Sequence, residues 1–116
     1  MTDGLLGFAT AAHLWGTIDS RPDQVHVVIA HSKRLYPPSW VRLHRVPVPP
    51  EAQTTQRALP ITGRTWTLLD YLPTLHRTDA SRLADRSLQR QWLTTRDIER
   101  RLRITQDAPA TYGSAN

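Results

Sequence analysis

The spacing of apolar residues near the start of the chain predicts a helix over residues 4–15. Apolar side chains recur there three and four positions apart, which is the period of one helix face. Gly16 follows directly, and glycine commonly ends a helix because it adopts left-handed backbone angles without a steric penalty. The two adjacent apolar rows are Leu6, Ala9 and His13, and Leu5, Phe8, Ala12 and Trp15.

Two segments rich in β-branched residues, 25–30 and 40–46, predict strands. The loop between them, 31–39, is basic and contains two prolines, and an antiparallel hairpin is the simplest structure for such a pair. Side chains alternate across a strand, so each face of the hairpin has its own set. One face, expected to be core, would carry Val25, Val27, Ile29, Val41 and Leu43, and the other His26, Val28, Trp40, Arg42 and His44.

A third strand is predicted near Leu59, because Leu59 and Ile61 alternate around Pro60. Proline cannot donate a backbone hydrogen bond, so it is tolerated at the edge of a sheet rather than inside it. The stretch over residues 47–56 is rich in proline and polar residues, and it predicts a connection without regular structure.

Three helices are predicted after this strand, and the first ends at Pro73. Their expected caps are Thr62, Thr78 with Asp79, and Thr94 with Asp97, the last pair matching a capping box. Their expected core residues include Leu68, Leu69, Leu83, Leu88, Ile98 and Leu102. Residues 105–116 are small and polar and predict a disordered tail.

These elements predict an α+β fold with a small, mostly antiparallel sheet of three strands and about four helices. The expected organisation is one domain over residues 1–104 followed by the tail. No run approaches the ~20 apolar residues that span a bilayer, so no membrane partner is expected and the protein is expected to be cytoplasmic. The oligomeric state is left open.

The composition excludes several kinds of chemistry. The 116 residues include no cysteine, which removes disulfides, thiolate zinc sites and cysteine nucleophiles. The sequence contains no nucleophile-elbow serine, no glycine-rich phosphate loop and no His-Glu-x-x-His motif. His26 and His44 lack a third ligand nearby in the sequence. We therefore expect no enzyme activity, no cofactor and no metal.

The charge pattern indicates binding. The formal net charge is +5, and a basic chain can bind either nucleic acid or an acidic protein. An ordinary solvated surface would also explain the same residues. The residues predicted to contact a protein partner are Trp40, Arg42 and His44 on the hairpin and Arg82, Arg86 and Arg90 on a helix face. Those predicted to contact nucleic acid are Lys33, Arg34, Arg96, Arg100, Arg101 and Arg103.

Five segments, taken in order, resemble bacterial antitoxins of the AbiEi family of type IV toxin–antitoxin systems. Residues 59–72, LPITGRTWTLLDYL, are similar to the family segment G-L-P-V-T-x-P-x-R-T-L-L-D-L-A. Residues 9–16 resemble its opening helix with a glycine stop, and residues 24–29 with the following Lys33 and Arg34 resemble x-V-H-V-T-V-P-x-x-R-R. Residues 41–51 resemble V-x-V-H-R-x-x-L-P-P-E-D, and residues 84–94 resemble L-D-x-A-L-x-R-G-x-V-T.

The resemblance implies an antitoxin-like regulatory domain that neutralises a nucleotidyltransferase-like toxin. The family's N-terminal winged helix represses the operon, and some members carry a C-terminal domain resembling very-short-patch-repair nucleases. The resemblance covers the core domain, and neither of these extra domains is expected in the sequence. Trp66 and the Gln91-Trp92 pair depart from the family pattern and indicate a divergent member. The alternative is a basic DNA- or RNA-binding module, related to the regulatory half of the proteins with a nuclease-like domain.

Overall fold

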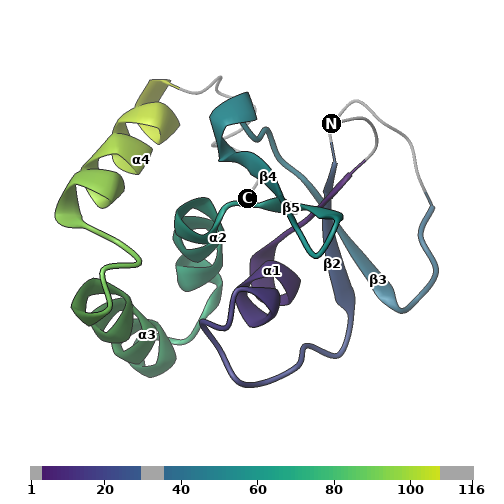
Figure 1. Ribbon diagram of the computed structural model, residues 1–116, viewed down its shortest axis with the longest axis horizontal. Coiled ribbons are helices and arrows are strands. Elements are labelled where there is room, and N and C mark those ends of the chain that lie inside the picture. Colours follow the sequence, from purple (N-terminus) through teal and green to yellow (C-terminus); the bar gives the residue numbers. More distant parts are fainter. Residues whose placement is uncertain (1–3, 30–35, 108–116) are drawn as a thin grey trace.

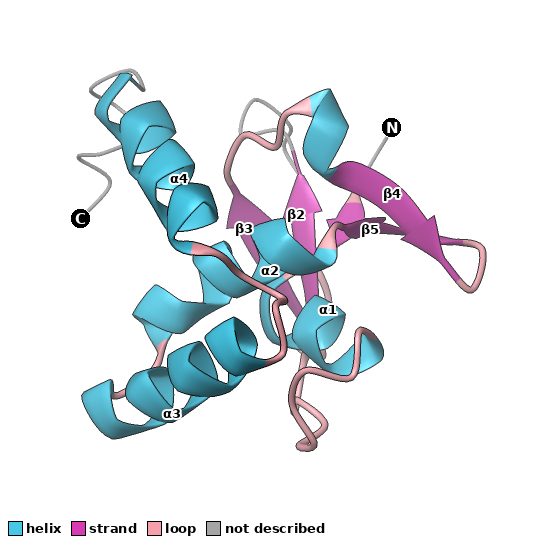
Figure 2. Cartoon of the chain, turned by 60° about the vertical axis from the view of Figure 1, so that its left-hand side comes forward, coloured by secondary structure: helices cyan, strands magenta, loops and turns pink. Residues whose placement is uncertain are grey.

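The computed structural model describes residues 4–29 and 36–107, which form an α+β fold. A five-stranded mixed sheet and four α-helices make up this part of the chain. The helices α1 and α2 lie against one side of the sheet, and α3 and α4 lie beyond them (Figures 1 and 2). The predicted fold class is therefore confirmed, whereas the predicted sheet of three mostly antiparallel strands is wrong.

The short strand β1 lies at the centre of the sheet, whose order is β3-β2-β1-β5-β4. It runs antiparallel to β2 and parallel to β5, while β2 and β3 are parallel and β4 and β5 are antiparallel. The sheet thus mixes both kinds of ladder. The strands are β1 (Leu5–Leu6), β2 (Val25–Ile29), β3 (Val41–Arg45), β4 (Gln53–Gln56) and β5 (Leu59–Thr62).

The predicted hairpin of β2 and β3 is wrong, because the two strands pair in parallel with Val25 opposite Val41 and Ile29 opposite Arg45. Parallel neighbours need a long crossover between them. Residues 30–40 supply that length, and residues 30–35 lie outside the described part. The antiparallel partner of β2 is instead β1, which comes from the start of the chain.

The predicted first helix begins later than expected, since Leu5 and Leu6 form β1 and α1 spans Phe8–Leu14. Gly7 lies between the two elements, and a Cβ atom built on it would lie 2.5 Å from Cγ2 of Val28. The missing side chain therefore lets the chain turn from the sheet onto its face. The predicted glycine stop is confirmed, because Gly16 follows α1 with a φ of 78°.

Strand β4 forms where an irregular connection was predicted, and it pairs with β5 as a hairpin. The turn between them is Arg57–Ala58, with φ values of 52° and 64°. Such left-handed turns usually contain glycine or asparagine. Because this one contains neither, the sequence lacks the usual hairpin signal.

The last three helices are α2 (Arg64–Tyr71), α3 (Arg77–Gln89) and α4 (Thr95–Asp107). The predicted capping box is confirmed: the Thr94 N–H donates to Asp97 Oδ2 at 2.9 Å, and the Asp97 N–H donates to Thr94 Oγ1 at 3.1 Å. The other predicted caps are wrong, since Gly63 precedes α2 and His76 precedes α3. Thr62 is the last residue of β5, where its hydroxyl is buried and contacts other side chains.

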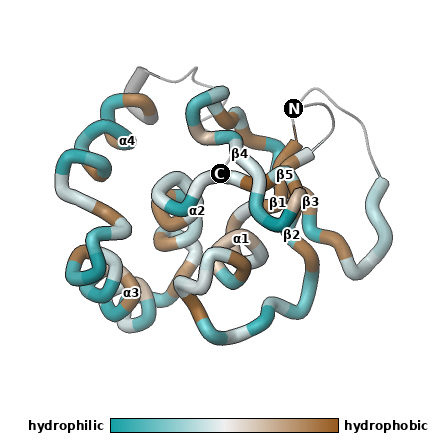
Figure 3. The backbone as a smooth tube through the Cα atoms, viewed as in Figure 1, coloured by the Kyte–Doolittle hydropathy of each residue, from teal (hydrophilic) through white to brown (hydrophobic). Residues whose placement is uncertain are grey.

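The described core includes a cluster of Leu68, Leu83 and Leu93 between α2, α3 and the start of α4. Leu69 packs against this cluster, whereas Leu88 is 40% exposed and its neighbour Ser87 is buried. The prediction of Leu88 as a core residue is therefore wrong. Apolar residues concentrate on β1 and β2, whereas β4 has none and α3 and α4 are mostly hydrophilic (Figure 3).

Leu102 is 58% exposed, so the predicted apolar contact of α4 is only partly made, by the half-buried Ile98. Val28 is buried although its face was predicted to be a mixed surface, because α1 covers that face. The predicted tail overlaps α4, which continues to Asp107, and residues 108–116 lie outside the described part.

Replacing Leu68 by alanine should lower the free energy of unfolding by about 2–5 kcal/mol, because a fully buried leucine leaves a cavity when truncated. The matched change Leu88→Ala should cost less, about 1 kcal/mol, because 40% of that residue's surface is already exposed to solvent. Urea unfolding followed by circular dichroism measures both. Equal losses in the two variants would contradict the assigned core.

Candidate functional site

In the described part of the chain, polar side chains gather at several places. They include the junction of α2 with α4, a histidine pair on β2 and β3, a groove beside α3, and hollows beside α4.

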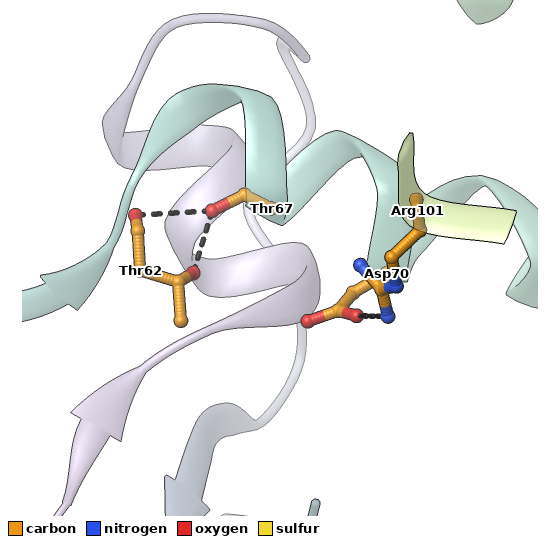
Figure 4. A network of polar contacts seen from close by, with 4 residues as sticks. All are labelled: Thr62, Thr67, Asp70 and Arg101. Atoms are coloured by element: carbon orange, nitrogen blue, oxygen red, sulfur yellow. Dashed lines mark hydrogen bonds and ion pairs between the residues drawn. The ribbon is translucent and has the colours of Figure 1, made fainter. Parts of the chain in front are cut away.

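Helix α4 is held to α2 by a buried ion pair between Arg101 and Asp70 (Figure 4). The two side chains are 14% and 4% exposed, respectively. The Arg101 guanidinium also lies over the Trp66 ring, 4.1 Å from its centroid. Burial raises the pKa of the Asp70 carboxyl, and the positive charge of Arg101 opposes that rise. Arg101, predicted to contact nucleic acid, is thus engaged within the protein.

The histidine pair joins the parallel strands β2 and β3. His26 Nδ1 and His44 Nε2 are 2.8 Å apart, so one ring must donate the hydrogen bond and the other accept it. The His44 ring stacks on Phe8 of α1 with centroids 3.8 Å apart. Burial lowers the pKa of His44 to about 4, with smaller contributions from His26 and Arg42. Burial and then Arg42 lower the pKa of His26 as well.

His44 was predicted to contact a protein partner, but its ring is half-buried and packs against Phe8 of the same chain. Arg42 is exposed on the same strand, and Trp40 precedes it with 62% of its surface exposed. The C-terminal helices therefore leave most of the Trp40 side chain uncovered. Within residues 4–29 and 36–107, no group of three or more His, Cys, Asp or Glu residues could hold a metal.

A groove of about 370 Å³ lies between α3, the end of α2 and residues 18–20. Arg82 and Arg86, one helical turn apart, are exposed at its rim. Half-buried and buried side chains form its floor: Ile18, Tyr71, Leu75 and Leu83. The remaining rim residues are Asp19, Ser20 and Asp79. The sequence did not indicate this groove, since its floor comes from segments far apart along the chain.

Two adjoining hollows of about 340 and 360 Å³ lie between α2, α4 and residues 47–52. Both are lined by Glu51, Trp66, Arg101 and Ile104, and the first also by the basic residues Arg64 and Arg100. Glu51 and Asp97 offset these positive charges. The hollows therefore combine apolar walls with nearly balanced charges.

The other described arginines of the predicted sites follow α3 or lie on α4. Arg90 follows α3, and its guanidinium lies 5.6 Å from the centroid of the Trp92 ring. Arg96, Arg100 and Arg103 are exposed on α4, and Lys33 and Arg34 lie outside the described residues. Strand β3 and helix α3 lie at opposite ends of the molecule (Figure 1), so the two predicted protein contacts are separate surfaces.

Comparison with protein-family models, with curated proteins and with solved structures gives no match to this chain. The resemblance to AbiEi antitoxins thus stays a prediction from the sequence segments. In the described part of the chain, no helix is both long enough and apolar enough to cross a membrane.

Replacing Arg101 by methionine should destabilise the protein by about 3–5 kcal/mol, because it leaves the buried Asp70 without its charge partner. The matched change Arg100→Met, on the exposed side of the same helix, should cost less than about 1 kcal/mol. Adding Asp70→Asn to Arg101→Met should recover part of the loss. Denaturant unfolding of these three variants and of Asp70→Asn alone measures the coupling, and additive losses would contradict a direct ion pair.

The melting temperature should fall as the pH is lowered from about 7 towards 4. Unfolded histidines bind protons near pH 6.5, whereas the folded state keeps His44 neutral down to about pH 4. The contribution of His44 to the stability of the folded state is therefore complete above pH 6.5, and it is lost as the pH falls from 6.5 towards 4. The variant His44→Gln should have a lower melting temperature at pH 7, and that temperature should depend less on pH. The exposed control His76→Gln should melt like the unmodified protein at each pH. Identical pH profiles in all three proteins would contradict this assignment.

Proposed function

We propose that this chain is an AbiEi-like regulatory domain that binds and neutralises a nucleotidyltransferase-like toxin. Five sequence segments in family order support the proposal, and they run through the sheet and the helices around it. The segment 59–72 covers β5 and α2 and includes Asp70, the residue that anchors α4. The proposed activity is binding in the cytoplasm, without a catalytic step.

The groove beside α3 is the observation that best supports direct binding of a protein partner. Its apolar floor offers a place for one or two aliphatic or aromatic side chains of a partner. Arg82 and Arg86 at its rim can each form charge-assisted hydrogen bonds with a partner carboxylate. Asp19 and Asp79 on the rim would repel a purely acidic surface, so the favoured partner segment carries an apolar anchor with an acidic residue on the arginine side.

Nucleic-acid binding through α4 is a second candidate function. Arg96, Arg100 and Arg103 are exposed on this helix, and Glu99 is the exposed acidic residue between them. Binding of this kind would weaken steeply with salt, with a logarithmic slope of about −0.9 for each phosphate neutralised on duplex DNA. A salt titration with duplex DNA therefore separates it from contact with an apolar groove.

Reversing both groove charges, with Arg82→Glu and Arg86→Glu, should weaken toxin binding at least about tenfold, or roughly 1.4 kcal/mol. The measurement is growth rescue and co-purification when the chain is co-expressed with the product of the neighbouring open reading frame. The control reverses Arg96 and Arg100, which have the same spacing on α4. No rescue by the unmodified chain would reject the antitoxin function. Equal weakening in both double variants would reject the groove as the contact.

A further inference from the structure

The segment 36–40, Tyr-Pro-Pro-Ser-Trp, presents two aromatic side chains to solvent just before β3. Tyr36 is 91% exposed and Trp40 is 62% exposed. An isolated exposed apolar residue needs no explanation, but two large aromatic residues exposed within five positions of the sequence favour a contact surface. We call this segment the 36–40 turn.

The backbone of the 36–40 turn is fixed by hydrogen bonds and by its prolines. The Val41 N–H donates to the Pro38 carbonyl at 3.0 Å, and the Val25 N–H donates to the Trp40 carbonyl at 2.9 Å. Gln24 Nε2 donates to the Ser39 carbonyl at 2.8 Å. Pro37 and Pro38 restrict the remaining dihedral angles. The Trp40 ring is therefore carried on a constrained backbone, which lowers the entropy lost when a partner binds.

The charge around the turn favours a polyanionic partner. Between Asp23 and Glu51 the sequence contains no acidic residue, and its basic residues there are Lys33, Arg34, Arg42 and Arg45. Arg42 is exposed two positions after Trp40. Lys33 and Arg34 lie outside the described residues and are placed here by sequence alone. An aromatic surface in an entirely basic stretch matches a ligand that offers flat rings and phosphates together.

The shape of this surface also favours stacking over insertion. The groove and the two hollows described above are lined by other residues, and none of them includes Tyr36, Trp40 or Arg42. Because both rings are largely exposed, a partner here would meet ring surface directly. Unpaired bases stack on such rings, whereas the bases of a duplex are already stacked and paired.

We propose that the 36–40 turn and Arg42 bind single-stranded nucleic acid. The rings of Trp40 and Tyr36 each stack on an unpaired base, and the Arg42 guanidinium contacts a backbone phosphate. This role lies on a different surface from the groove beside α3 and does not depend on the chain being an antitoxin.

The test measures fluorescence anisotropy of a labelled oligothymidylate of about 15 nucleotides, a length within the range of single-strand binding sites, titrated at low salt with the full chain. Trp40→Ala should weaken binding about five- to 100-fold, because each stacked base contributes strongly to affinity. Trp40→Phe should keep most of the affinity, because it retains a ring. A duplex of the same length should bind more weakly than the single strand, and melting curves should show that the variants are folded.

A charge comparison separates the Arg42 contact from general attraction. Arg42→Gln should reduce the magnitude of the logarithmic salt slope by about 0.7, the contribution of one phosphate on a single strand. Arg77→Gln removes an exposed arginine from α3, at the far end of the molecule, and should leave the slope unchanged (Figure 1).

Three results would overturn the proposal. The first is no binding of the single strand at low salt. The second is that Trp40→Ala binds the oligonucleotide as tightly as the unmodified chain does. If the double variant Arg96→Glu, Arg100→Glu then abolishes binding, the nucleic acid lies on α4 instead. The third is loss of toxin neutralisation in Trp40→Ala without any oligonucleotide binding, which would assign the turn to a protein partner.

Discussion

The arrangement of the helices depends on a buried polar junction at the end of β5. The Thr62 carbonyl accepts hydrogen bonds from Trp15 Nε1 at 2.8 Å and from Thr67 Oγ1 at 3.1 Å. The two threonine hydroxyls are 2.6 Å apart (Figure 4). Both threonines are fully buried, and a buried polar group without a partner would cost about 1–3 kcal/mol. The junction therefore fixes the end of α1 and the first turn of α2 against the sheet.

Placing α2 in this way determines how α4 is attached. Trp66 and Asp70 lie one turn apart on α2, and together they receive the Arg101 side chain from α4. The attachment is thus largely an ion pair and a cation–π contact, supplemented by the half-buried Ile98, while Leu102 remains exposed. A directional contact of this kind sets the rotation of α4 about its axis, because the guanidinium must meet both the carboxylate and the ring. The other arginines of the helix, Arg96, Arg100 and Arg103, are then exposed.

The molecule consequently presents two dissimilar surfaces at its two ends (Figure 1). At one end, α3 contributes two arginines beside an apolar groove, which suits a shaped protein segment. At the other end, the 36–40 turn offers exposed rings within a basic stretch, which suits flat, charged ligands. Between them, the His26–His44 pair packs against Phe8 and contributes to the fold. The proposed protein contact and the proposed nucleic-acid contact therefore use different residues of the chain.

The sequence by itself determined the elements whose signals are local. The strand over Val25–Ile29, the glycine after α1, the Thr94–Asp97 capping box and the burial of Leu68 all follow from spacing and short-range hydrogen bonding. Tertiary structure decided features that depend on distant partners. Leu5 and Leu6 have a helical apolar period but become a strand, because β2 and β5 offer backbone hydrogen bonds on both sides. The direction of β3, the hairpin without glycine, the groove floor and the pairing of Asp70 with Arg101 likewise depend on residues far apart in the sequence, which no local pattern relates to one another.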